Sequence, residues 1–157
     1  MARELETRRC HVCGQRSLRR VPWLYEYEIS HDGRPPVKIR IPDLLVIACT
    51  NPECRPEHPH DTILLDDAAS WQITIETSKQ LGLLTPDEIR QGRERLGLSQ
   101  QELQELLGLG SNSLSRWENG HVFQSRSMNT LLRLVFHFPE VVSFLREKAA
   151  GQSTPAA

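Results

Sequence analysis

Four cysteines in the first third of the chain have the type and spacing of metal ligands. They form two close pairs, Cys10 with Cys13 in a C-x2-C arrangement and Cys49 with Cys54 in a C-x4-C arrangement. Two such pairs can converge on a single tetrahedral Zn²⁺. In so small a segment, the ion would stabilise a fold whose apolar core is too small to be stable alone. The spacing therefore predicts one structural zinc ion held by four cysteines.

Alternatives to this ligand set stay open. His58 or His60, which closely follow Cys54, would replace that residue if the wider second pair did not close around the ion. A second alternative is a set of free or redox-active thiols. Metal catalysis is not expected, because four thiolates leave no coordination position for water. No nucleophile with a matching base stands out elsewhere, and we predict that the chain is not an enzyme.

A second set of side chains has the types that read DNA. Asn112 and Arg116 lie four residues apart and would project from the same side of a helix. In the major groove, Asn pairs with adenine and Arg with guanine. We predict that this pair reads bases. DNA-backbone or supporting roles are expected for Gln100, Ser111, Ser113, Arg126 and Ser127.

The segment Leu98–Gly120 has the signals of two helices joined by a tight turn. Ser99 and Glu102 form a capping box at the start of the first helix. Gly108 and Gly110 interrupt the apolar pattern where the turn is needed, and Gly120 would end the second helix. The segment therefore predicts a helix-turn-helix.

Further helices are expected on both sides of this segment. Thr85–Glu88 contains a capping threonine, a proline at the first helical position and the glutamate of a capping box. Ser127 is expected to cap a fourth helix, and Pro139 to begin a fifth. The fourth helix has more apolar residues than one buried face needs, so part of it would be a dimer interface unless it is fully buried. Phosphate contacts are possible for three arginines of the first helix, Arg90, Arg93 and Arg95.

The N-terminal segment has the pattern of a small antiparallel sheet. Alternating runs at 23–28 and 37–41 flank His31-Asp32-Gly33, which predicts a hairpin. Residues 44–48 are a third apolar run, and 63–65 a short strand. Asp66 and Asp67 would cap a helix to about Gln80, although Trp71, Ile73 and Ile75 also alternate as in a strand.

These elements predict an α+β chain, in which a small zinc-pinned antiparallel β domain precedes an all-α five-helix domain that contains the helix-turn-helix. The expected ranges are 1–65 for the zinc domain, 66–84 for a helical connector that contains a break at 81–84, 85–149 for the DNA-binding domain and 150–157 for a disordered tail. Two copies of the helix-turn-helix about one helical turn apart would read a palindromic operator, which predicts a homodimer through the C-terminal domain.

Composition sets further limits. The 157 residues have a net charge of −1, which predicts weak non-specific DNA binding and a dependence on base contacts. No apolar run approaches the ~20 residues of a membrane span. The start, MARELETRRC, has no apolar signal region, so we expect a cytoplasmic protein without a membrane partner.

Two resemblances extend this interpretation. LSQQELQELLGLGSNSLSRWENG resembles the Xre/Cro helix-turn-helix family. The order of C-x2-C-G, hairpin, second cysteine pair, connector and helix-turn-helix resembles the MqsA/YgiT-type antitoxin family across nearly the whole chain. That resemblance implies zinc ligation by Cys10, Cys13, Cys49 and Cys54, base reading by Asn112 and Arg116, and a C-terminal domain that dimerises. It also implies a partner toxin, a ribonuclease, bound by the zinc domain, and repression of the operon by the C-terminal domain.

Three functions follow as hypotheses. The first is a zinc-containing repressor that is the antitoxin of a type II toxin–antitoxin pair. The second is a stand-alone zinc-finger and helix-turn-helix regulator without a toxin. The third is a cysteine redox or metal-transfer protein.

Overall fold

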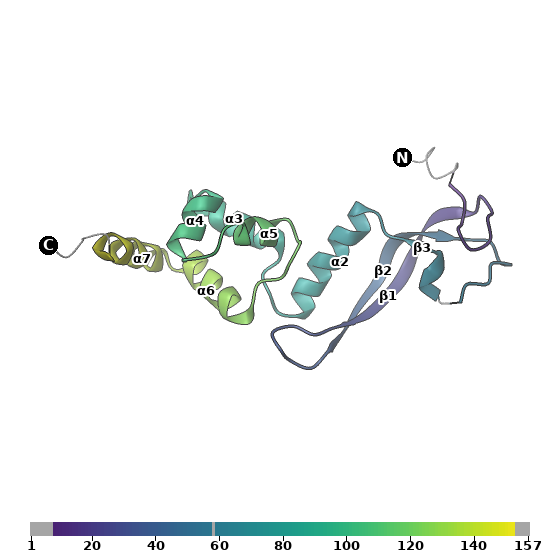
Figure 1. The fold of residues 1–157 in the computed structure, drawn as a ribbon, viewed down its shortest axis with the longest axis horizontal. Helices are drawn as coiled ribbons and strands as arrows, with labels where there is room; N and C mark the ends of the chain where they lie inside the picture. Colours follow the sequence, from purple (N-terminus) through teal and green to yellow (C-terminus); the bar gives the residue numbers. More distant parts are fainter. Residues whose placement is uncertain (1–7, 58, 153–157) are drawn as a thin grey trace. The chain divides into compact units, whose positions relative to one another are not determined.

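The computed structural model describes residues 8–57 and 59–152 (Figure 1). The chain divides into two compact units. The first contains the residues up to Ile29 together with Pro36–Glu76. The second contains the turn Ser30–Pro35 together with the residues from Thr77 onward.

The first unit is built on a three-stranded antiparallel sheet in the order β1-β2-β3. Its strands are β1 (Leu18–Ile29), β2 (Val37–Cys49) and β3 (Ile63–Leu64), and the short helix η1 (Pro59–Thr62) leads into β3. The hairpin and the short last strand are confirmed.

The runs at 37–41 and 44–48, which we expected to be separate, form one strand. The register between β1 and β2 shifts between Trp23 and Tyr25, and Asp43 has a positive φ of 54°. A regular strand interior would not accommodate Pro42 and Asp43, but a bulge does. Pairing with β1 therefore continues beyond these two residues.

Helix α2 (Asp67–Gln80) confirms the helix predicted for this segment, where a strand was the alternative. Asp66 caps it, since its carboxylate Oδ1 accepts a hydrogen bond from the Ala69 backbone N–H at 2.9 Å. This bond, together with the neighbouring Arg20 guanidinium, lowers the pKa of the Asp66 carboxyl. Because the cap fixes the start of the helix, the alternation of apolar residues in this segment does not produce a strand.

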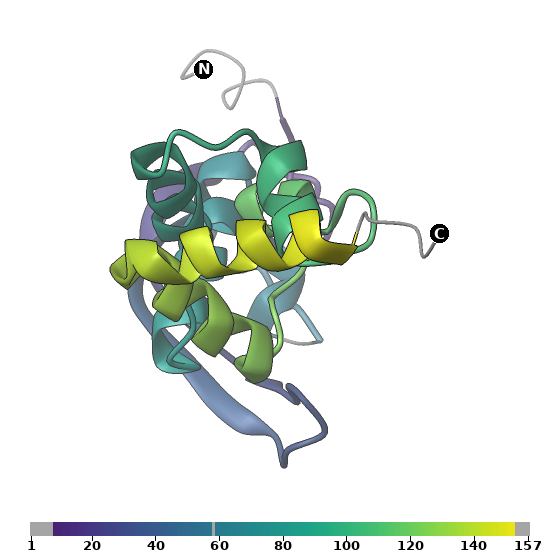
Figure 2. The same ribbon diagram turned by 90° about the vertical axis from the view of Figure 1, so that its left-hand side faces the viewer.

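The second unit contains five helices after α2: α3 (Pro86–Arg95), α4 (Gln100–Leu106), α5 (Ser113–Glu118), α6 (Arg126–His137) and α7 (Pro139–Gln152). The α+β class with a five-helix second part is confirmed. Figure 2 shows α7, in yellow, passing in front of the other helices of this unit. Its Val142 joins a core made by Leu84, Ile89, Leu98, Leu103, Leu114, Leu132 and Val135. No helix in the described part of the chain has both the length and the apolar character needed to span a membrane.

Most predicted helix ends are confirmed. The capping boxes of Thr85 with Glu88 and of Ser99 with Glu102 are both present. The tail predicted from residue 150 is helical as far as Gln152, and residues 153–157 lie outside the described part.

The predicted cap of the fourth helix is wrong. Ser125 caps α6 instead of Ser127, and its hydroxyl accepts from the Met128 N–H at 3.2 Å. Asn129, one turn into α6, is buried, and its Oδ1 accepts from the Leu84 N–H at 2.7 Å. This tertiary hydrogen bond distinguishes two serines that are equally good caps by local sequence.

Candidate metal centre and helix-turn-helix surface

The sulfur atoms of Cys10, Cys13, Cys49 and Cys54 all lie within 4.8 Å of one another. The Sγ–Sγ distance is 4.0 Å between Cys10 and Cys54 and 3.7 Å between Cys13 and Cys49. A tetrahedron with Zn–S bonds of ~2.3 Å has edges of about 3.8 Å. The arrangement therefore fits a tetrahedral thiolate-bound metal ion and is too open for disulfides.

Two turns and the end of β2 place these four sulfurs. Gly14, with a positive φ of 70°, closes the first turn through its N–H to the Cys10 carbonyl at 2.8 Å. In the wider second pair, the Cys54 N–H donates to the Asn51 carbonyl at 3.1 Å, and the Asn51 side chain accepts from the Glu53 N–H. The turn at Asn51 thus takes up the two extra residues of the C-x4-C spacing.

The surroundings of the four thiols give Cys13 and Cys54 different pKa values. A hydrogen bond from the Gln15 backbone lowers the pKa of Cys13 to about 6, while burial raises the pKa of Cys54 to about 12. Four thiolates at these distances repel one another, so full ionisation requires a cation among them. His58 lies outside the described residues, as does the side chain of His60, so the histidine alternative stays untested.

Asn112 was predicted to lie within the second helix of the helix-turn-helix, and this prediction is wrong. Asn112 is the N-cap of α5, with a left-handed backbone (φ 66°) and no side-chain capping bond. Its carbonyl accepts the Arg116 N–H at 3.0 Å. The cap comes from α4, since the Gln104 Oε1 accepts the Leu114 N–H at 3.1 Å. The Asn112 amide is therefore left free for another partner.

Asn112 and Arg116 are both exposed, and within the described chain neither side chain has a hydrogen-bond partner. Beside Asn112 lies a hollow of about 500 Å³ between α4 and α5. Amides and hydroxyls dominate its lining, which consists of Gln100, Gln101, Gln104, Glu105, Leu109, Ser111, Asn112 and Ser115. The structure thus brings Gln100, Ser111 and Asn112 to one polar groove, while Arg116, Ser113, Arg126 and Ser127 lie outside its lining.

A buried ion pair holds α3 and α5 together. The Arg93 Nε donates to Glu118 Oε1 at 2.6 Å, and Arg93 Nη2 donates to Oε2 at 3.0 Å. Glu118 is 0% exposed and Arg93 9%. The bond to Glu118 raises the pKa of Arg93. Gln100 Nε2 also donates to Glu118 Oε2 at 2.8 Å, so this carboxylate joins three helices.

The phosphate contact that the sequence allowed for Arg93 is not compatible with the structure, because its guanidinium is committed to Glu118. Arg90 is also partly engaged, since its Nη2 donates to the Glu118 carbonyl at 2.9 Å. A signal was present in the sequence. Arg93 follows the buried Ile89 by four residues, and Glu118 follows the buried Leu114 by four, so opposite charges occupy two inward faces.

These features define a class of protein: a helix-turn-helix protein with an N-terminal four-cysteine module. The family model described as the antitoxin component of a bacterial toxin–antitoxin system, MqsA, matches residues 8–146. The chain belongs to this MqsA antitoxin family.

Two curated antitoxins are similar to this chain. Antitoxin MqsA of Escherichia coli (strain K12) is 27% identical over 138 residues, which is 88% of this chain and 99% of that protein. Antitoxin HigA-2 of Vibrio cholerae serotype O1 is 36% identical over 64 residues, 41% of this chain and 62% of that protein.

Proposed function

We propose that this chain is the antitoxin of a type II toxin–antitoxin pair, which represses its own operon and binds its toxin, a ribonuclease, through the N-terminal metal domain. Membership of the MqsA family supports the toxin partner. The observation that carries the DNA-binding part is the pair of free, exposed side chains of Asn112 and Arg116 at α5. A regulator of this kind needs no catalytic group.

The metal bound in the first unit is proposed to be one zinc ion with a structural role. The Sγ separations and a donor set of four thiols, which fills a tetrahedral coordination sphere, support this assignment. Since thiolates must lose their protons to bind, the ion is held less tightly as the pH falls.

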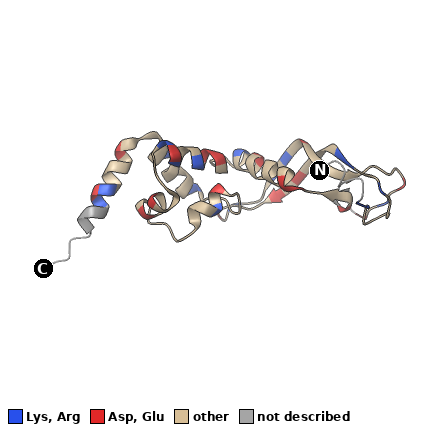
Figure 3. Ribbon diagram, turned by 90° about the horizontal axis from the view of Figure 1, so that it is seen from above, with Lys and Arg blue, Asp and Glu red and all other residues tan. Residues whose placement is uncertain are grey.

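The DNA-binding domain is proposed to span 85–149, and its base contacts to come from Asn112 and Arg116. Further residues are proposed to contact the DNA backbone or to support these two side chains: Gln100, Ser111, Ser113, Arg126 and Ser127. Gln100 supports α5 through Glu118. In Figure 3, the ribbon positions of positively and negatively charged residues are interspersed along the helices, in keeping with the net charge of −1. Specific contacts therefore contribute more to binding than a general attraction to phosphate.

A homodimer on a palindromic operator is proposed from the apolar surface of α6 and α7. Leu132 and Val135 of α6 are buried, but Leu134 is 43% exposed. Phe138 and Phe144 are 50% and 62% exposed. Large exposed aromatic and aliphatic side chains on neighbouring elements favour an interface between two copies of the domain.

Arg116→Ala is expected to weaken binding to the DNA upstream of the chain's own gene by about 1–3 kcal/mol per half-site, because a bidentate contact to guanine is lost. Titration of a labelled duplex measures this loss, and light scattering of the complex is expected to give two chains per operator. The control is Arg133→Ala, which removes an exposed arginine of α6. Equal affinities of the two variants would contradict base reading by Arg116.

A further inference from the structure

The turn Ser30–Pro35 belongs to the second unit and lies on the loop that connects α5 to α6. The Asp32 Oδ2 accepts the Arg126 backbone N–H at 2.6 Å. His31 Nε2 donates to the Gln124 carbonyl at 3.1 Å, and the His31 ring stands edge-on to Phe123 with centroids 6.3 Å apart. Two residues of this loop and the first residue of α6 therefore hold the turn.

The amide that Asp32 occupies is the first of α6. Arg126 follows the cap Ser125, so its N–H has no acceptor within the helix. Such amides at the positive end of a helix dipole favour anions. A carboxylate is bound at this position in the structure, which shows that the amide is directed at an anion.

The same amide lies at a position suited to DNA. The loop 119–125 joins it directly to α5, and helix N-termini are among the groups that contact phosphate beside a groove. Arg126 adds a guanidinium whose Nε is buried without a hydrogen-bond partner among the described residues. One N–H cannot serve a carboxylate and a phosphate at once, and the two anions repel each other.

We propose that the turn Ser30–Pro35 is an autoinhibitory element in which Asp32 occupies the phosphate site at the N-terminus of α6. DNA phosphate displaces the Asp32 carboxylate from the Arg126 amide, so that the free chain binds DNA more weakly than a chain without this carboxylate. The inference rests on the proposed DNA-binding function and adds to it a competing intramolecular ligand.

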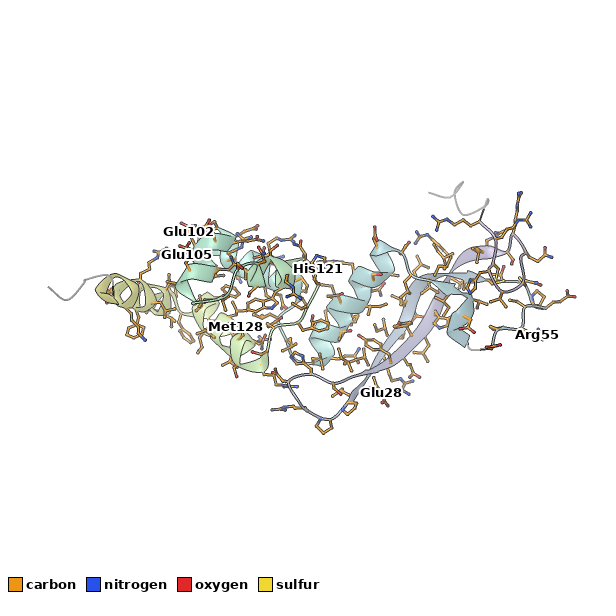
Figure 4. The ribbon with its side chains drawn as sticks, in the orientation of Figure 1. Glu28, Arg55, Glu102, Glu105, His121 and Met128 are labelled. Atoms are coloured by element: carbon orange, nitrogen blue, oxygen red, sulfur yellow. The ribbon has the colours of Figure 1, made fainter. Side chains whose placement is uncertain are left out.

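The test uses the full, metal-loaded chain and substitutions that keep the backbone of the turn. Asp32 has a positive φ of 55°, which Asn and Gly accept readily. Asp32→Asn removes the charge, and Asp32→Gly removes the acceptor as well. Glu28→Gln is the matched control, because it removes one exposed carboxylate from β1 outside the turn (Figure 4).

Each protein is titrated with two duplexes, one from the region upstream of its own gene and one with the same bases scrambled. Asp32→Asn is expected to bind both duplexes about threefold more tightly than Glu28→Gln, and Asp32→Gly more tightly still. The slope of log K against log salt is expected to steepen by about 0.9 for each phosphate gained by Asp32→Gly. Affinities of both Asp32 variants equal to or below that of Glu28→Gln would overturn the inference.

The two duplexes separate this inference from the proposed function. If Arg116→Ala changes the affinity for neither duplex, the proposal that Arg116 reads bases is wrong. The scrambled duplex still tests the role of Asp32, because its phosphates compete with the Asp32 carboxylate. If Arg116→Ala weakens only the upstream duplex and the Asp32 variants match Glu28→Gln, only the autoinhibitory turn fails. Failure of every protein to bind either duplex would overturn both.

Discussion

Chelation of the metal ion proposed at the four cysteines is expected to unfold the β1–β2 sheet and to leave α3–α7 folded. The cysteines are part of the core of the first unit, where Cys10, Leu18 and Ile47 are buried and the other three cysteines pack against them with Leu64. Structural zinc sites contribute apparent binding free energies of about 10–16 kcal/mol at neutral pH. The sheet also buries Ile39, Ile41, Leu44 and Val46, but the loss of a metal contribution of this size is still expected to exceed the stability of the sheet.

Amide hydrogen exchange followed by mass spectrometry measures this effect in the intact chain. Peptides from β1 and β2 are expected to lose protection after chelation, while peptides from α3 and α6 keep theirs. Cys49→Ser is expected to behave like the chelated protein. The control is His11→Ala, which removes an exposed side chain between two of the cysteines. Unchanged protection of β1 and β2 without metal would show that the cysteines are not a structural site.

Glu118→Gln is expected to destabilise the second unit by about 3–5 kcal/mol. The substitution preserves shape but leaves the buried Arg93 guanidinium without its counter-charge, and an uncompensated buried charge is strongly unfavourable. It also weakens the bond to Gln100, so α4 loses a contact to α5. Chemical denaturation followed by circular dichroism measures the change in the free energy of unfolding.

Two variants show whether the charge itself is responsible. Glu105→Ala, which removes an exposed carboxylate of α4 (Figure 4), is expected to change stability by less than about 0.5 kcal/mol. Arg93→Met combined with Glu118→Leu is expected to recover much of the lost stability, because apolar pairs of similar volume often replace a buried ion pair without cost. A Glu118→Gln variant as stable as Glu105→Ala would contradict the importance of the pair.

The second part of the fold was predictable because its helix signals are local. Thr85 and Ser99 each form a complete capping box within four residues, and both boxes are present. The start of α6 was not predictable from local sequence, because Asn129 and its bond to Leu84 distinguish Ser125 from Ser127. Tertiary contacts therefore decide an ambiguous cap.

In the first part, the strands were predictable but their continuity was not. Pro42 and Asp43 end a regular strand by local rules, yet the bulge opposite Trp23 and Tyr25 lets β2 continue. The convergence of the cysteines followed from spacing alone, and the structure brings their sulfurs within 4.8 Å. The DNA-reading roles of Asn112 and Arg116 stay predictions.

Co-expression with the neighbouring gene tests the central proposal most directly. The neighbour's product is expected to arrest growth when expressed alone, to be neutralised by this chain, and to co-purify with it through the metal domain. A variant with Cys49→Ser is expected to lose both rescue and co-purification. A harmless neighbour that does not bind this chain would contradict the antitoxin proposal and leave a metal-containing regulator of transcription.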